Sequence, residues 1–434
     1  MGNCSSSKCA PAPKAINLCY ERKWEEIKVF LFSNATEKKK IESLMYKHND
    51  VWTCLHEACS YRAPLQVIEA MIKVGGRELL RGGTSTALHN ACTRRFAAPA
   101  EIVELLIDAG GKDLVMQKDH NGRTALHGAC RCGASIEIVE FLVAAGGRDL
   151  VLQKDNHGRT ALHASCRYGA TSEIVEILIA TGGKELVMQS TNHGETALHE
   201  VRFHKKDSYS ETLDIVRALL TVGGRDLAMQ KHKYGRTALQ RVCIYVTRLT
   251  PPRETSEALE MLKWMMKREV LRKEDIQENN LLVESCCASD SHGEERFRFL
   301  VEWNPQALKV SDHRSILHDL LGHRLIDRNE ALSRFKIALR ATMKYYADEL
   351  GFLFQKYNPA DKTTVVEKAY TEFGKEATWK IVEDCLEENS IMIHERNSRN
   401  NVYPFMIGAV SDSSDVSIVY YLLRKSPFAL GDMN

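Results

Sequence analysis

Residues 122–157 read GRTALHGACRCGASIEIVEFLVAAGGRDLVLQKDNH, and residues 158–193 read GRTALHASCRYGATSEIVEILIATGGKELVMQSTNH. The second stretch repeats the first with four of its five glycines, its Thr-Ala-Leu-His tetrapeptide and its Ile-Val segment in register. The tetrapeptide slot recurs at spacings of 33, 38, 36, 36 and 41 residues, with copies that start at Thr53, Thr86, Thr124, Thr160, Thr196 and Thr237. A period in this range predicts a stacked repeat array rather than a domain with one central core.

The first half of each repeat carries the signals for a short helix. Gly122 closes a turn, and Thr124 suits the N-cap position because its hydroxyl can accept hydrogen bonds from the exposed amides of the first turn. Leu126, Ala129 and Cys130 follow at the spacing that places apolar side chains on one helical face. This half of the repeat is therefore predicted to be a short helix.

The second half predicts a longer helix and then an extended finger. Apolar residues at helical spacing favour a helix from about Ile136 to Ala145. Gly146-Gly147 ends this helix, because glycine readily adopts the left-handed conformation common at helix C-termini. We expect Arg148–Asp155 to form an extended finger that leads to the next turn at Gly158.

This unit resembles the ankyrin repeat, whose pattern is a glycine turn, Thr-Pro-Leu-His, a short helix, a longer helix, and then glycine and an extended finger. The resemblance implies an all-α ankyrin-repeat solenoid of stacked helix-turn-helix units. Two departures are an Ala in place of the Pro and a period of 36 residues in place of 33. The resemblance further implies that the fourth-position histidines bond to the backbone of the adjacent turn. These are His56, His89, His127, His163 and His199.

The repeats suggest a division of the chain into four segments. These are a disordered, acylated tail at 1–13, an N-terminal capping repeat at 14–50, ankyrin repeats at 51–275, and degenerate helical repeats with a C-terminal cap at 276–434. Two loops are enlarged, at 203–211 and 246–256. Each is either a solvated loop or a partner contact or phosphorylation site, and the sequence does not distinguish these alternatives.

The net charge and the placement of the cysteines argue against nucleic-acid binding and against a disulfide framework. The net charge of +2 gives no field that favours nucleic acid. Six cysteines occupy the seventh position of their repeats, where a small buried side chain is expected, so they predict packed thiols rather than disulfides. These are Cys59, Cys92, Cys130, Cys166, Cys243 and Cys286. Reduced thiols favour the cytosol or nucleus.

The first residues form a second informative pattern. Met1-Gly2-Asn3-Cys4-Ser5-Ser6 fits N-myristoylation of Gly2, and Cys4 suits S-palmitoylation. One myristoyl chain binds membranes only marginally, whereas two acyl chains anchor stably. The expected localisation is therefore the cytoplasm, at the cytosolic face of a membrane. The alternative is a disordered polar tail in which both residues are coincidental.

The chain shows no pattern that predicts catalysis, a metal or a cofactor. The repeat histidines lie one per unit and do not converge on a metal. Phosphate-binding loops, nucleophile elbows and dinucleotide fingerprints are missing from the sequence. We predict a protein that is not an enzyme; an active site within 324–401 is the least favoured alternative.

The resemblance places partner contacts at finger tips and at exposed positions of the short helices. The candidate partner-binding residues are Arg94, Lys118, His120, Arg131, Lys154, Asn156, Arg167, Tyr168, Lys231 and Tyr234. The expected function is a protein–protein scaffold or adaptor, a monomer, that binds an unidentified protein or peptide. The alternative is a soluble ankyrin-repeat regulator in the cytosol or nucleus that masks a partner. Neither nucleic acid nor a small-molecule substrate is expected.

Overall fold

The computed structural model describes most of the repeat array and parts of the remaining chain. The described residues are 14–46, 52–81, 85–92, 98–202, 209–248, 255–279, 281–286, 293–311, 314–322, 328–346, 364–389, 403, 406 and 416–425. The chain divides into two compact units, Met1–Ala238 and Leu239–Asn434.

The described part of the first unit is helical, with short and long helices in alternation along most of its length. Its helices are α1 (Lys14–Tyr20), α2 (Trp24–Phe32), α3 (Glu37–Met45), α4 (Cys54–Ser60), α5 (Leu65–Leu80), α6 (Ala87–Ala91), α7 (Ala100–Val115), α8 (Ala125–Cys132), α9 (Ile136–Val151), α10 (Ala161–Tyr168), α11 (Ser172–Met188), α12 (Ala197–Glu200) and α13 (Tyr209–Ala228).

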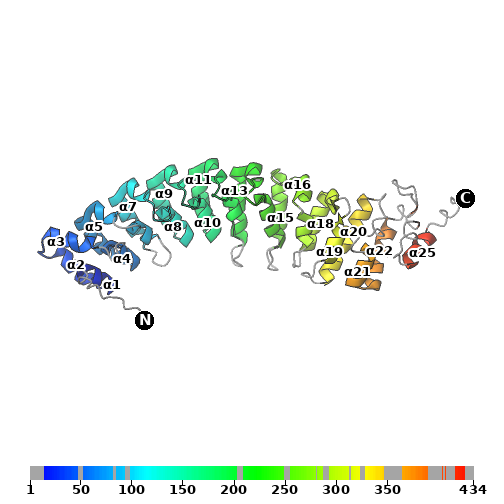
Figure 1. Ribbon diagram of the computed structural model, residues 1–434, viewed down its shortest axis with the longest axis horizontal. Helices are drawn as coiled ribbons and strands as arrows, with labels where there is room; N and C mark the ends of the chain where they lie inside the picture. The colour runs from blue at the N-terminus through cyan, green and yellow to red at the C-terminus, as the bar shows by residue number, and fades with distance from the viewer. Residues whose placement is uncertain are drawn as a thin grey trace, which may run out of the picture. The chain divides into compact units, whose positions relative to one another are not determined.

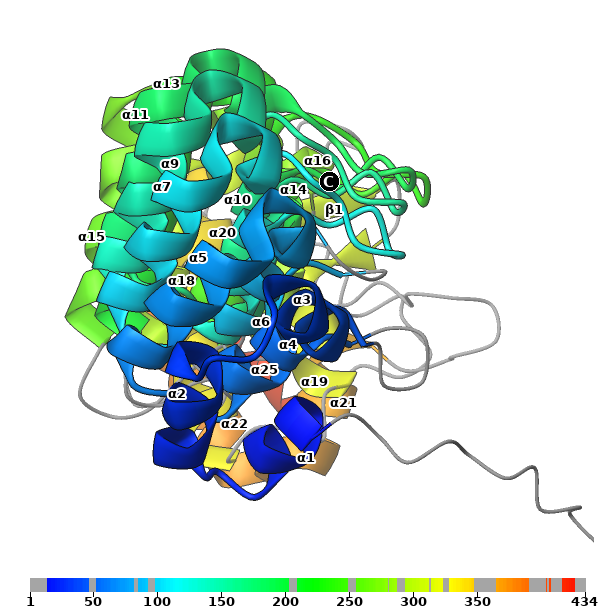
Figure 2. The same ribbon diagram turned by 90° about the vertical axis from the view of Figure 1, so that its left-hand side faces the viewer.

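These helices form two layers. The short helices α4, α6, α8, α10 and α12 pack each against the next, and the long helices α5, α7, α9, α11 and α13 do the same. Figure 1 shows the long helices in a row, and Figure 2 shows the short helices between them and the loops that form the fingers. The predicted all-α solenoid is confirmed.

Burial explains why the tetrapeptide recurs. Leu126, Ala129 and Cys130 are fully buried in α8, as the helical spacing predicted. Gly133 follows α8 with a left-handed φ of 66°, which ends the helix before α9 begins. Each repeat thus buries one face of a short helix against its neighbours rather than in a common core.

The expected finger at Arg148–Asp155 is wrong over its first half. The helix α9 continues to Val151 and is only kinked at Gly147, where φ is 62°. It resumes because Leu150 and Val151 are buried against the array. A Cβ on Gly146 would lie 2.5 Å from the Leu150 Cβ, so the first glycine of the pair is required by contact and the second by its φ.

The residues after three of the glycine pairs link successive repeats by charge. Lys112 pairs with Asp149 at 2.6 Å, and Lys184 pairs with Asp226 at 3.2 Å. The pair of Arg148 and Glu185, at 2.5 Å, lies between these two pairs along the array. We name these three pairs the charge ladder. Its side chains are more than half exposed, so each pair is worth little on its own.

The stretch that was expected to be a capping repeat contains three helices. In it, α1 packs against α4 and α2 packs against α5, so this pair extends both layers. The helix α3 was not expected; it follows α2 and packs against α5. Residues 1–13 lie outside the described part of the chain, and the proposed cap at 14–50 remains a prediction.

The second unit is also mainly helical. Its elements are α14 (Ala238–Arg248), which starts at the last residue of the first unit, α15 (Thr255–Lys267), α16 (Lys273–Glu278), α17 (Leu281–Cys286), α18 (Gly293–Trp303), the 3-10 helix η2 (Pro305–Leu308), β1 (Lys309–Ser311), β2 (Arg314–Ser315), α19 (Ile316–Gly322), α20 (Arg328–Tyr345), α21 (Val365–Phe373), α22 (Lys375–Glu388) and α25 (Val416–Lys425). The strands β1 and β2 pair antiparallel.

Helices of the second unit also pack in two series. The helix α19 packs against α17 and α21, while α18 and α22 both pack against α20. The division between units falls at residue 238, whereas the sequence suggested ankyrin repeats up to 275, so that boundary also stays a prediction. Among the described residues, no helix has the length and apolar composition needed to cross a bilayer.

Candidate functional site

The tetrapeptide histidines link neighbouring repeats. The Thr124 N–H donates to His127 Nδ1 at 3.2 Å, and His127 Nε2 lies 3.0 Å from the Arg159 carbonyl oxygen in the next repeat. A carbonyl can only accept, so Nε2 carries the proton and Nδ1 accepts. The same bonds join His89 to Arg123, His163 to Glu195 and His199 to Arg236. The role that the ankyrin resemblance implied for these histidines is confirmed.

Burial favours the neutral form of three of these rings. It lowers the pKa of both His127 and His163 to about 4, although the hydrogen bond to the next backbone carbonyl acts in the opposite direction. It also lowers the pKa of His89. A neutral ring retains the one tautomer that satisfies both of its bonds, so burial and hydrogen bonding act together to hold neighbouring repeats in place.

Several predicted partner residues instead bind the neighbouring finger. Lys118 Nζ donates to the Lys154 carbonyl oxygen at 2.8 Å, and Lys154 Nζ donates to the Ser190 carbonyl oxygen at 2.9 Å. The Asn156 side-chain amide donates to the His120 carbonyl oxygen at 3.2 Å. These four residues therefore have a structural role in aligning the fingers, and their contact with a partner remains a prediction.

The finger at residues 231–234 presents a different surface. Tyr234 is 76% exposed, and the Lys233 ammonium lies 4.8 Å from the centre of its ring. The His232 ring packs edge-on against Tyr234, and Lys231 is exposed beside it. The predicted residues Lys231 and Tyr234 thus lie on one finger, and the cation in contact with the Tyr234 ring is Lys233.

The short helices bring three other predicted residues together. The Arg131 guanidinium lies 5.3 Å from the centre of the Tyr168 ring, which is 40% exposed. Arg167 Nη1 donates to Glu200 Oε2 at 2.6 Å. Both arginines come from the last turns of adjacent short helices. We name the stacked pair of Arg131 and Tyr168 the Arg–Tyr pair. Arg94, Gly2 and Cys4 lie outside the described residues.

A buried carboxylate lies beside the C-terminal ends of α10 and α12. Glu200 is 4% exposed and accepts from Arg159 Nε at 3.2 Å as well as from Arg167. Gly128 and Ala164 occupy the matching positions of the two preceding repeats. A buried carboxylate is costly unless it is paired, and two guanidinium groups provide that pairing.

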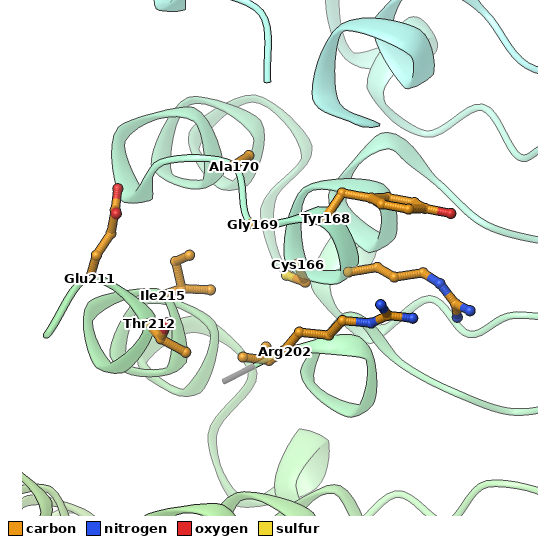
Figure 3. Close-up of a pocket in the computed structure, with 10 residues that line it drawn as sticks. Cys166, Tyr168, Gly169, Ala170, Arg202, Glu211, Thr212 and Ile215 are labelled. Carbon is orange, nitrogen blue, oxygen red and sulfur yellow. The ribbon is translucent and has the colours of Figure 1, made fainter. Parts of the chain in front are cut away.

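A cavity of about 200 Å³ lies next to the Arg–Tyr pair (Figure 3). It is lined by Cys166, Arg167, Tyr168, Gly169, Ala170, Val201, Arg202, Glu211, Thr212 and Ile215. It forms where α12 ends at Glu200, so this short helix lacks the last turn that α10 has. In α10 a second turn follows the position that matches Glu200. Among the described residues α12 has no such turn, so no helix lies over the loop at Gly169.

Sequence reasoning missed the residues on the far side of this cavity. Glu211, Thr212 and Ile215 belong to α13, and only the fold brings them beside the end of α10. One signal was present: Val201-Arg202-Phe203 follows Glu200 where the earlier repeats have Cys and then a loop glycine. That departure marks the early end of the short helix.

No metal site or disulfide is evident among the residues that the structure describes. No group of three or more His, Cys, Asp or Glu side chains in them could hold a metal ion. The buried repeat cysteines are free thiols, and burial raises the pKa of Cys59 and of Cys130 to about 12. A thiol held protonated in this way packs as a small apolar group.

Comparisons with known proteins bear on the repeats. A model of three ankyrin repeats matches residues 55–154, and a single ankyrin-repeat model matches residues 157–188. The crystal structure of EF0377, an ankyrin repeat protein, is 19% identical; the match covers 48% of this chain and 98% of that one, with a TM-score of 0.37. No curated protein matches significantly. The chain therefore contains ankyrin repeats, at residues 55–154 and 157–188.

Proposed function

We propose that this protein is a non-enzymatic interaction scaffold that binds a protein or peptide and is tethered to the cytosolic face of a membrane. Ankyrin repeats indicate protein partners. The observation that carries the binding proposal is the Arg–Tyr pair, an exposed stack across two neighbouring short helices. Arginine and tyrosine are enriched among the residues that dominate binding energy at protein interfaces.

Rigidity supports the same proposal. The histidine bonds and finger contacts fix adjacent repeats relative to one another, so the surface residues of α8 and α10 are held in place before a partner arrives. Preorganisation of this kind reduces the entropy that binding would otherwise cost. Finger residues that already bond to neighbouring backbone have fewer donors left for a partner, which favours the short-helix surface.

Partner capture tests the binding proposal. The full-length wild-type protein and the Arg131→Ala/Tyr168→Ala variant are compared as baits in a cell extract, with quantitative mass spectrometry as the readout. We expect a discrete set of proteins on the wild type that the variant retains at less than a tenth of the level. The matched control is Arg148→Ala/Glu185→Ala in the charge ladder, which should retain them. Capture that is equal on all three baits would contradict the proposal.

The tether rests on Gly2 and Cys4. A myristoyl chain on Gly2 gives reversible membrane binding, and a second chain on Cys4 makes it stable. The wild type, Gly2→Ala and Cys4→Ser are compared by membrane fractionation and intact mass. We expect the wild type in the membrane fraction with two acyl masses, Cys4→Ser partly released, and Gly2→Ala soluble. An unmodified, soluble wild type would remove the tether and leave a soluble binder.

A further inference from the structure

The cavity beside α10 has an apolar floor. Ala170, which precedes α11, Val201, which follows α12, and Ile215 of α13 line it and are themselves buried, so these walls are fixed by the packing of the array. Its volume of about 200 Å³ is below the ~300 to 1,000 Å³ that is usual for small-molecule sites. The space suits one apolar side chain better than a cofactor or metabolite.

The rim of the cavity is divided by charge. Figure 3 shows Arg202 and Tyr168 reaching away from the cavity on the same side, while Glu211 lies at the opposite edge. The Glu211 carboxylate already accepts from the Ser172 N–H at 3.2 Å. One oxygen of that carboxylate is therefore engaged within the chain, and the cationic and aromatic groups of the rim lie on the side of Arg202 and Tyr168.

The acidic groups near Arg202 are already engaged. Glu200 is buried and bound by Arg159 and Arg167, and none of the described carboxylates forms an ion pair with Arg202. The Arg202 side chain is exposed, and Arg131 lies a short distance along the same face, stacked on Tyr168. Among the described residues, this side of the cavity mouth therefore carries the guanidinium group of Arg202 next to an apolar pocket, while the carboxylate of Glu211 lies at the opposite edge.

We propose that this cavity, together with Arg202, binds a short acidic segment of a partner protein. One leucine- or phenylalanine-sized side chain of that segment fills the space between Ala170, Val201 and Ile215. A neighbouring aspartate or glutamate pairs with Arg202, and the Tyr168 ring covers the segment from the side. This inference rests on the proposed binding function and assigns it a partner chemistry.

The charge requirement follows from the surface itself. An arginine at an interface pairs best with a carboxylate, through two parallel hydrogen bonds. A basic segment would be repelled by Arg131 and Arg202, and a purely apolar one would leave Arg202 to be desolvated without a partner. The geometry thus selects a carboxylate within a few residues of the buried apolar side chain.

A random octapeptide library displayed on phage tests the proposal against the immobilised full-length protein. We expect enriched sequences to share an aspartate or glutamate within three residues of a leucine, isoleucine, methionine or phenylalanine. The best peptide is then resynthesised with a fluorophore and titrated by polarisation. No enrichment, or enrichment of peptides without an acidic residue, would overturn the proposal.

Variants of the chain locate the peptide. We expect Arg202→Glu to weaken binding at least tenfold and Arg202→Lys to weaken it less, while Arg148→Glu, the same charge change in the charge ladder, has no effect. Thr212→Phe should also weaken binding at least tenfold by filling the cavity, with its folding checked by the thermal midpoint. If Thr212→Phe does not fold, the arginine series still decides. Equal binding to wild type and Arg202→Glu would overturn the proposal.

The two proposals fail in different ways. If no acidic peptide binds but the wild type still captures partners through the Arg–Tyr pair, the scaffold function stands and the cavity is not the site. If capture also fails, the binding function itself is wrong. Loss of capture with Arg202→Glu, beside the loss of peptide binding, would place the natural partner at this cavity.

Discussion

Two neighbouring repeats of the first unit share their stacking residues and differ at the end of the short helix. Thr160 and His163 in one, and Thr196 and His199 in the other, make the same local bond and the same bond to the next repeat. The helix α10 then runs for eight residues, whereas α12 has only four. The tetrapeptide fixes each unit in the stack, so the residues after it can vary without loss of the fold.

The difference creates the candidate site. In the second of these repeats, Glu200 occupies the position of Ala164 and draws Arg159 and Arg167 toward it. The early end of the helix leaves the cavity beside Tyr168. Stacking residues and surface residues are therefore separate sets, and substitutions in the first should change stability while those in the second should change binding.

The largest expected loss of stability comes from a substitution at a buried residue of the short helix α8. Replacing Leu126 with Asp places an unpaired carboxyl in a fully buried position, which should cost about 4 kcal/mol or more. Because each unit contacts only its neighbours, the two sides of α8 should then unfold separately. Urea unfolding followed by circular dichroism tests this, with Tyr168→Asp as the exposed comparison. A single, unshifted transition for Leu126→Asp would contradict the stacked-repeat account.

The next largest effect should be a loss of folding stability in acid, because two buried tetrapeptide histidines gain protons on unfolding. The folded pKa of His127 and His163 is about 4, below the ordinary value of 6.5, so the unfolded chain binds more protons between these limits. Stability is therefore full above pH 6.5 and falls as the pH drops from 6.5 to 4, by on the order of 3 kcal/mol for each ring. Urea midpoints at pH 7.5 and 4.5 measure the fall.

The variant His127→Gln tests whether the tetrapeptide histidines cause this loss of stability in acid. It removes one of the titrating rings, so the difference between the two pH values should shrink by a comparable amount. An unchanged difference would mean that other groups dominate the acid sensitivity. His120→Gln, at an exposed finger position, is the control and should leave the difference as it is.

Loss of the threonine hydroxyl should have a smaller effect. Thr124 Oγ1 lies 2.9 Å from His127 Nδ1 and helps to orient the ring. Thr124→Ala should cost on the order of 1 kcal/mol, the usual value for a lost N-cap side chain. Chemical denaturation at pH 7.5 measures it. If the midpoint does not move, the start of α8 does not depend on this threonine.

The charge ladder should contribute least. Arg148→Ala removes an exposed pair with Glu185 and should change the free energy of unfolding by no more than about 0.5 kcal/mol. The difference from wild type should vanish in 1 M salt, because screening acts strongly on exposed pairs. A larger loss that persists in salt would show that the ladder stabilises the stack beyond its exposed contacts.

The sequence predicted the elements that depend on local rules. Thr124, Leu126 and His127 identify the start, the buried face and the inter-repeat bond of α8, because each acts within one turn or at a fixed repeat distance. The finger was predicted incorrectly over Arg148–Val151. Gly147 favours the end of a helix by its residue type, but burial of Leu150 and Val151 makes the chain resume the helix after the kink.

Tertiary contacts explain what the sequence could not supply. Lys118 and Lys154 look like free surface cations in the sequence, yet each bonds to the carbonyl of a residue 36 positions further along. Likewise, the cavity depends on α13 lying beside the end of α10. The enlarged loop at 203–211 separates the two helices in the sequence, so the repeat spacing does not predict this contact. Contacts between repeats, which no local sequence pattern reveals, determine both features.

The most direct test of the account measures binding and stability on the same proteins. A partner from the capture experiment is titrated by calorimetry into wild type, Arg131→Ala/Tyr168→Ala and Thr124→Ala, and each is unfolded in urea. We predict that the surface variant loses at least tenfold in affinity with stability changed by less than about 0.5 kcal/mol. Thr124→Ala should lose stability and keep its affinity. Unchanged affinity in the surface variant, or affinity that follows stability in both, would contradict the account.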